Sequence, residues 1–261
     1  MRTTLVALGL WAIGQTVSLA GIAVVGGLDR SHTVKPGESF EGIILVRNTG
    51  TEPVEVRVHQ TDYQFFADGR NLYERPGNQP RSNADWISVR PSRFTIAPNE
   101  IVSVSYKGVV PKQENLSGTY WSMVMVEPES TAPVQQVGLG LQTKIRFGVQ
   151  LVTEVGETAR AAIKVLDKKL ITGDGKRKLQ LDLENSGQRL LVPAVWVELF
   201  NKQGQSVGKF EAGRSRIFPA CSVRYNIDLS DVPAGHYSAL VIVDNGDEHV
   251  MGAQYELEIQ P

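Results

Sequence analysis

The residues of this sequence that could do chemistry are few and scattered. Ser206 and Lys209 have the S-x-x-K spacing in which a lysine activates a serine, but they lie in what reads as a hairpin. The acidic run Asp244–Glu248 offers oxygen ligands for calcium, yet it lacks the ligand spacing and flanking helices of an EF-hand. No H-E-x-x-H or Walker A motif occurs, and Gly204–Gly208, which fits G-x-S-x-G, lies in the same apparent hairpin and not in a strand-turn-helix elbow. The sequence therefore predicts a protein that is not an enzyme, with no catalytic residue, metal or cofactor.

Charge and cysteine content exclude further classes of protein. The 261 residues carry 27 Lys+Arg and 28 Asp+Glu, a formal net charge of −1, which argues against a nucleic-acid partner. A basic cluster from Lys164 to Lys178 has no aromatic residues within it and reads as a solvated face. The single Cys221 excludes an intramolecular disulfide, and its strand-like context predicts a buried, unreactive thiol.

Residues 1–20 read as a cleaved secretory signal. Arg2 supplies the positive start, Leu5–Ile13 is an apolar run, and the small residues Ser18 and Ala20 suit cleavage before Gly21. The apolar run is shorter than the ~20 residues that span a bilayer. We therefore expect export, and a mature chain that does not span a membrane.

The elements that must position any site are strands. Short alternating runs between turn residues dominate, and no long apolar stripe of helical period occurs. Two series of such runs look like a divergent repeat: Ile44–Gly50 matches Leu181–Gly187, and Pro98 matches Pro219. This predicts an all-β chain of two tandem immunoglobulin-like β-sandwiches, residues 21–156 and 157–261, after the signal peptide 1–20.

Two further features belong to this prediction. A tyrosine opens the penultimate strand of each series, Tyr120 and Tyr237, and resembles the tyrosine corner of immunoglobulin-like sandwiches. The polar stretch Arg70–Asp85 reads as a loop inserted in the first sandwich.

The segment Val137–Leu151 reads as one long strand in which nearly every odd position is apolar. One interpretation makes it the half-buried last strand of the first sandwich. The other makes it a strand lent to a partner, because an edge strand can pair with another chain while alternate side chains fill that chain's pockets. In the second interpretation Val137, Leu139 and Leu141 would fill the partner's groove.

The first half of the chain resembles the PapD-like periplasmic pilus chaperones. The resemblance rests on Val137–Arg146, which is similar to the donor strand of that family, and on Leu28–Asn48, which aligns without gaps to its first strands. The order Pro98, Pro111, Tyr120–Val126 also follows the family. The resemblance implies two immunoglobulin-like domains, a periplasmic location and an exported, pilin-like subunit as partner, with an outer-membrane assembly platform as a possible second partner.

The resemblance also implies a pair of basic residues that bind the carboxylate at the client's C-terminus. Arg146 falls on the donor-strand position, and a guanidinium suits a carboxylate. The first-strand position falls on His32, with Arg30 two residues earlier on the same face. The function implied is an ATP-independent chaperone that acts by donor-strand complementation. The alternative is a structural or adhesive immunoglobulin-like module without chaperone activity.

Overall fold

The structure is a computed structural model that describes residues 21–129, 145–156, 159–173, 175–246 and 250–260. The described chain is all-β, with one short 3-10 helix, η1 (Ala84–Trp86). The predicted signal peptide (1–20) lies outside the described residues. The predicted boundary at 156/157 adjoins two residues that are also outside them, so it stays a prediction. The described part contains no helix long and apolar enough to cross a membrane.

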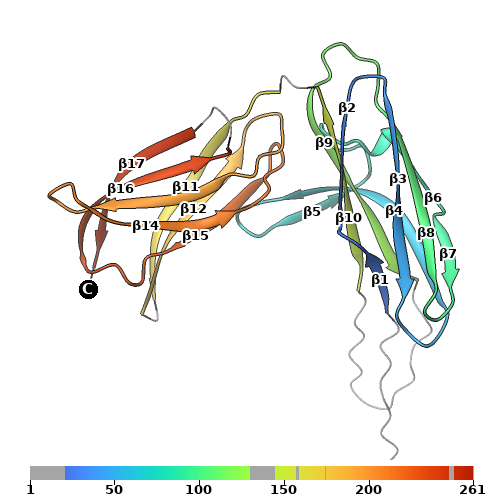
Figure 1. The fold of residues 1–261 in the computed structure, drawn as a ribbon, viewed down its shortest axis with the longest axis horizontal. Helices are drawn as coiled ribbons and strands as arrows, with labels where there is room; N and C mark the ends of the chain where they lie inside the picture. The colour runs from blue at the N-terminus through green and yellow to red at the C-terminus, as the bar shows by residue number, and fades with distance from the viewer. Residues whose placement is uncertain (1–20, 130–144, 157–158, 174, 247–249, 261) are drawn as a thin grey trace, which may run out of the picture.

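Two sheets form the first sandwich (Figure 1). One has the strand order β1-β3-β8-β6, and the other has the order β2-β10-β9-β4-β5, with β7 paired to β4. Alternate side chains of the two sheets enclose a core that includes Ile44, Val104 and Leu151. The strands are β1 (Ile22–Val25), β2 (Asp29–Val34), β3 (Ser39–Asn48), β4 (Val54–Phe65), β5 (Asn71–Glu74), β6 (Ile87–Arg90), β7 (Arg93–Ile96), β8 (Ile101–Val109), β9 (Gly118–Pro128) and β10 (Phe147–Val155).

The second sandwich is built from β11-β12-β15 packed on β14-β13-β16-β17. Its core includes Leu183, Val197 and Cys221, so the prediction of a buried cysteine is confirmed. Burial raises the pKa of the Cys221 thiol to about 11, which keeps it protonated and unreactive. The strands are β11 (Ile163–Gly173), β12 (Lys176–Asn185), β13 (Ala194–Phe200), β14 (Ser206–Arg214), β15 (Ser222–Asp228), β16 (Gly235–Asp244) and β17 (Val250–Ile259).

The predicted repeat is matched by equivalent hydrogen bonds in the two sandwiches. Asn48 and Asn185 are both fully buried, and each side-chain amide donates to two backbone carbonyls. Each side-chain oxygen accepts the backbone N–H two residues later. Each asparagine carbonyl also accepts an N–H from a residue of positive φ, Asn99 (62°) or Ala220 (60°), which follows the matched prolines. The two predicted sandwiches are therefore confirmed.

The sandwiches meet at an apolar seam. Trp121 of β9 stacks on Phe218 with ring centroids 4.7 Å apart, and it belongs to the core cluster of the second sandwich. The backbone N–H of Leu190 donates to Thr119 Oγ1 over 2.6 Å, and Arg216 pairs with Asp29 over 2.7 Å. The two sandwiches consequently share one core cluster at their junction.

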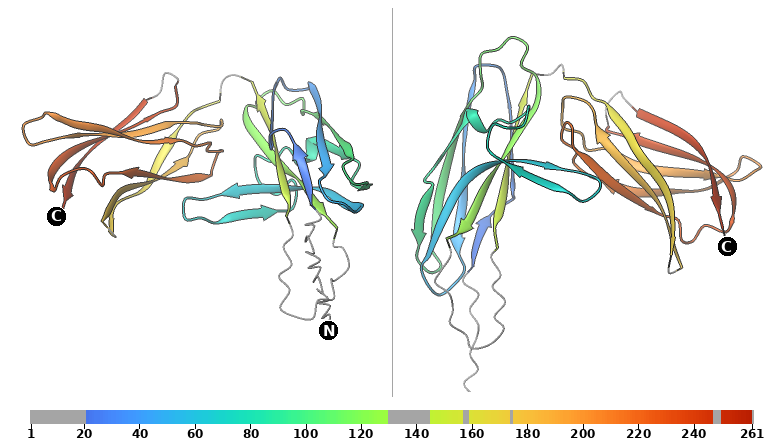
Figure 2. Two further views of the ribbon diagram at one scale, coloured as in Figure 1. Left: turned by 60° about the horizontal axis from the view of Figure 1, so that its bottom comes forward. Right: turned by 180° about the vertical axis from the view of Figure 1, so that it is seen from behind.

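The segment Arg70–Asp85 was predicted as a loop, and this prediction is wrong in part. Residues Asn71–Glu74 form β5, which pairs with the second half of β4. The hairpin projects toward the second sandwich (Figure 2), where Ala67 N–H donates to Ser222 Oγ over 2.9 Å. Its polar sequence hides the strand because β5 is short and largely exposed.

Candidate functional site

The most distinctive feature of the first sandwich is a change of sheet by its first strand. β1 pairs antiparallel with β3, whereas β2 pairs parallel with β10 in the opposite sheet. Gly26, at φ 87°, makes the crossing, a backbone conformation that glycine adopts without strain. The register between β2 and β10 begins at Asp29 opposite Gln150. Among the described residues, Phe147–Val149 therefore pair only with β9, and their other backbone edge is open.

Only residues 145–151 of the strand predicted over Val137–Leu151 are described, and within them its limits are corrected. Ile145 and Arg146 are not in a strand, while β10 runs on to Val155. Val149 and Leu151 are fully buried in the chain's own core, and Phe147 packs against that core. Ile145, in the same alternation, is 56% exposed. The odd-numbered side chains thus leave their own core between Phe147 and Ile145. Val137, Leu139 and Leu141 lie outside the described residues.

The three basic residues implied by the resemblance do not all come together. Arg146 is exposed at the residue before β10, whereas the second sandwich follows the other end of that strand. Arg30 lies opposite Leu151, five residues further along β10, and His32 lies beyond it. At about 3.3 Å per residue, Arg146 is roughly 16 Å from Arg30 along the strand direction. Arg30 and His32 do share one face of β2, as predicted.

Arg30 supports the crossing between β1 and β2. Its Nη1 donates to the carbonyls of Gly27 (2.7 Å) and Asp29 (2.9 Å). These bonds hold the backbone where the strand changes sheet. The guanidinium has five N–H donors, so others stay available for an anionic group. The Gly26-Gly27 pair ahead of a polar strand is the sequence signal that marks this crossing.

His32 is packed inside its own sandwich. Its ring stacks on Phe40 with centroids 4.5 Å apart, and Nε2 is 2.9 Å from Tyr106 Oη. Room for these rings comes from glycines directly across the strand pair, since a Cβ on Gly42 would collide with the Tyr106 hydroxyl. Desolvation lowers the pKa of His32, so the ring is neutral near pH 7. A neutral, occupied imidazole is poorly suited to hold a carboxylate.

Ser206 and Lys209, which have the S-x-x-K spacing, contact different partners. Ser206 Oγ donates to Glu198 Oε1 over 2.9 Å. Lys209 Nζ instead pairs with Glu211 over 2.7 Å and lies over the Trp196 ring. The described residues contain no group of three or more His, Cys, Asp or Glu side chains that could hold a metal ion.

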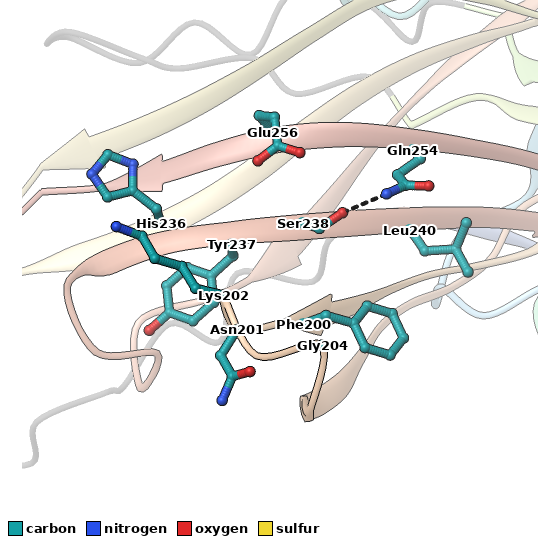
Figure 3. Close-up of a pocket in the computed structure, with 10 residues that line it drawn as sticks. All are labelled: Phe200, Asn201, Lys202, Gly204, His236, Tyr237, Ser238, Leu240, Gln254 and Glu256. Atoms are coloured by element: carbon teal, nitrogen blue, oxygen red, sulfur yellow. Dashed lines mark hydrogen bonds between the residues drawn. The ribbon is translucent and has the colours of Figure 1, made fainter.

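A shallow hollow of about 670 Å³ lies on the outer face of the second sandwich, far along the chain from the open edge (Figure 3). Its lining is mixed, with Phe200 and Leu240 beside the polar residues His236, Ser238, Gln254 and Glu256. The hydrogen bond drawn there joins Gln254 Nε2 to Ser238 Oγ over 2.8 Å. The Ser238 hydroxyl is thus bonded to an amide and not to a base.

Solved structures with a similar fold include several fimbrial chaperones. The class 5 fimbriae chaperone CfaA is 11% identical, with 90% of this chain and 98% of that chain covered and a TM-score of 0.49. A chain of the CsuC–CsuE chaperone–tip subunit complex from Acinetobacter baumannii is 11% identical, covering 89% and 98%, with a TM-score of 0.46. A chain of the Salmonella enterica SafA pilin–SafB chaperone complex is 14% identical, covering 93% and 99%, with a TM-score of 0.42.

Further chaperones occur among these matches. No protein-family model matches the sequence, and no curated protein matches it. Likeness at such low identity concerns the fold alone, so the function has to be argued from the residues of this chain.

Proposed function

We propose that this protein is an exported, periplasmic chaperone that acts without ATP and binds pilin-like subunits by lending them a strand. The observation that supports the proposal is that the alternating apolar side chains before β10 no longer pack in the chain's own core. Phe147 packs inside, Ile145 is 56% exposed, and the sequence continues the same phase at Val137, Leu139 and Leu141. Those three side chains would fill the groove of a subunit that lacks one of its own strands.

The open backbone edge supplies the second half of the argument. Because β2 joins β10 only from Gln150 onward, the backbone N–H and C=O of Gly148, which face that side, have no strand partner among the described residues and are available to another strand. A client strand aligned there would add to the sheet of the first sandwich. The apolar groove of the client would stay covered until the client is transferred to an outer-membrane assembly platform.

Arg146 is the best candidate for binding a client carboxylate, because it is exposed and adjoins the open edge. Arg30 is set back along β2 and serves the crossing, so it would meet a different part of the client. His32 contributes packing rather than charge in this proposal.

The test compares two double variants of the mature protein. Leu139→Glu plus Leu141→Glu should abolish co-purification of a small β-rich subunit from the exported fraction, because charges cannot enter an apolar groove. The matched control is Ile101→Glu plus Val109→Glu, two exposed positions on β8 of the same sandwich. The control should retain the subunit, and Arg146→Ala should weaken its capture. Persistence of binding in the Leu139/Leu141 variant would exclude strand donation.

The alternative is a structural or adhesive module, and the burial of Val149 and Leu151 in the chain's own core favours it. It predicts that no variant changes what co-purifies. It also predicts that the segment Val134–Leu141 resists limited proteolysis in the free protein, whereas a strand held ready for a client would be cut there.

A further inference from the structure

The last strand of the second sandwich has an unprotected edge. β17 pairs with β16 over ten residues without a register shift, and its other backbone edge is free among the described residues. Its sequence contains no lysine, arginine or proline between Val250 and Ile259. Long, regular edges of this kind are templates for pairing with another chain.

Most other edge strands of the described chain are short or interrupted, and β15, the regular edge of the β11-β12-β15 sheet, has seven residues against ten in β17. In the first sandwich, β1, β5, β6 and β7 have four residues each, and β2 has six. In the second, β11 has a bulge between Val165 and Asp167 and carries Lys168 and Lys169. The pairing of β14 with β13 shifts register twice. Bulges and lysines are the usual means of preventing edge-to-edge pairing, and β17 has neither.

We propose that β17 pairs antiparallel with β17 of a second copy of this chain, centred on Gln254. The charge pattern supports a partner of identical sequence. In this register Gln254 lies opposite its own copy, Glu256 lies opposite Gly252, and Glu258 lies opposite Val250. Both glutamates therefore avoid a like charge directly across the new strand pair, which would be destabilising.

A neighbouring register is disfavoured by a charge on the inner face. Centring the pair on Tyr255 would place that ring opposite its own copy. Lys168 Nζ lies 3.0 Å from the Tyr255 ring centroid, so this register would bring two ammonium groups together. The Gln254-centred register places Ala253 opposite Tyr255 instead.

The outer face is compatible with this dimer. The even-numbered side chains of β17 are exposed, and Gln254 is held on this face by its bond to Ser238 (Figure 3). Pairing would join two four-stranded sheets into one continuous sheet. The two hollows that Gln254 lines would then adjoin each other across the two-fold axis.

The experiment is sedimentation velocity of the mature protein over a range of concentrations. The parent should form a dimer. Gln254→Lys should raise the dimer dissociation constant by about tenfold or more, since it places two lysines opposite each other, and Gln254→Glu should do the same with carboxylates. An equimolar mixture of the two variants should restore dimers by pairing Lys with Glu. Gln203→Lys, an exposed glutamine in the hairpin before β14, is the matched control and should behave as the parent.

Three results would overturn the proposal. They are a parent that is monomeric at every concentration, a dimer unaffected by either Gln254 substitution, and a mixture that stays monomeric. A monomeric parent would leave the edge to a strand from another protein. The inference does not depend on client binding, because the Leu139→Glu plus Leu141→Glu variant should still dimerise.

Discussion

The two sandwiches share one corner and differ in how their edges are finished. Asn48 and Asn185 make the same set of side-chain and backbone hydrogen bonds, both fully buried. Around that corner, the first sandwich splits its first strand between two sheets and, among the residues that the structure describes, leaves the beginning of β10 paired on one side alone. The second has an unbroken ten-residue edge at β17. The common corner belongs to both sandwiches, whereas the edges that differ are the ones we propose to pair with other chains.

The seam between the sandwiches shows a second difference. The first sandwich contributes Trp121 to the core cluster of the second, and the projecting β4–β5 hairpin adds Phe65. Phe65 meets Phe218 edge to face with centroids 6.1 Å apart. The first sandwich therefore supports its neighbour as well as itself.

The largest effect should come from the shared corner. Asn48→Ala and Asn185→Ala should each lower the free energy of unfolding by roughly 2–4 kcal/mol, because buried backbone groups lose their partners. Urea denaturation measures this change. Asn201→Ala is the control, since Asn201 makes a comparable set of bonds at an exposed turn and should cost less than about 1 kcal/mol. Losses that differ strongly between the two buried sites would contradict the equivalence of the corners.

An intermediate effect should separate the two tyrosines. Tyr237 Oη donates to the Pro233 carbonyl over 2.8 Å, so Tyr237→Phe should cost about 1 kcal/mol in the same assay. Tyr120 packs instead against Trp86, and the described residues show no hydrogen bond to its hydroxyl. Tyr120→Phe should change stability by less than about 0.5 kcal/mol. Equal costs would mean that both sandwiches have a functional tyrosine corner.

The smallest effect should be the pH dependence contributed by His32. Burial against Phe40 lowers its pKa below the ordinary value of 6.5, so the unfolded chain binds this proton more readily than the folded chain. The stability from neutral His32 is therefore complete above pH 6.5 and is lost as the pH falls below it. Urea midpoints at about pH 7 and about pH 5 should fall less for His32→Asn than for the parent. Parallel profiles would show that His32 titrates normally.

Sequence patterns sufficed where the controlling interactions are local or repeated. The Asn-x-Gly turns with their paired prolines predicted both sandwiches, and Cys221 was correctly expected to be buried. The predicted beginning of β10 was wrong because the apolar alternation continues through Ile145. The alternation does not show at which residue the strand leaves the core. Tyr120 and Tyr237 occupy matched positions in the repeat, yet their hydroxyls differ because the residues that surround them differ.

The sequence by itself determined the all-β class, the two-sandwich repeat and the shared Arg30–His32 face, because strand period and turn chemistry are local. Only the tertiary structure decided which distant segments meet. It separated Arg146 from Arg30 by about 16 Å along the sheet. It also enclosed His32 against Tyr106 and left β17 as a regular edge with no second partner strand in the described part of the chain. These outcomes depend on pairing register and packing between residues far apart in the chain, which no local pattern records.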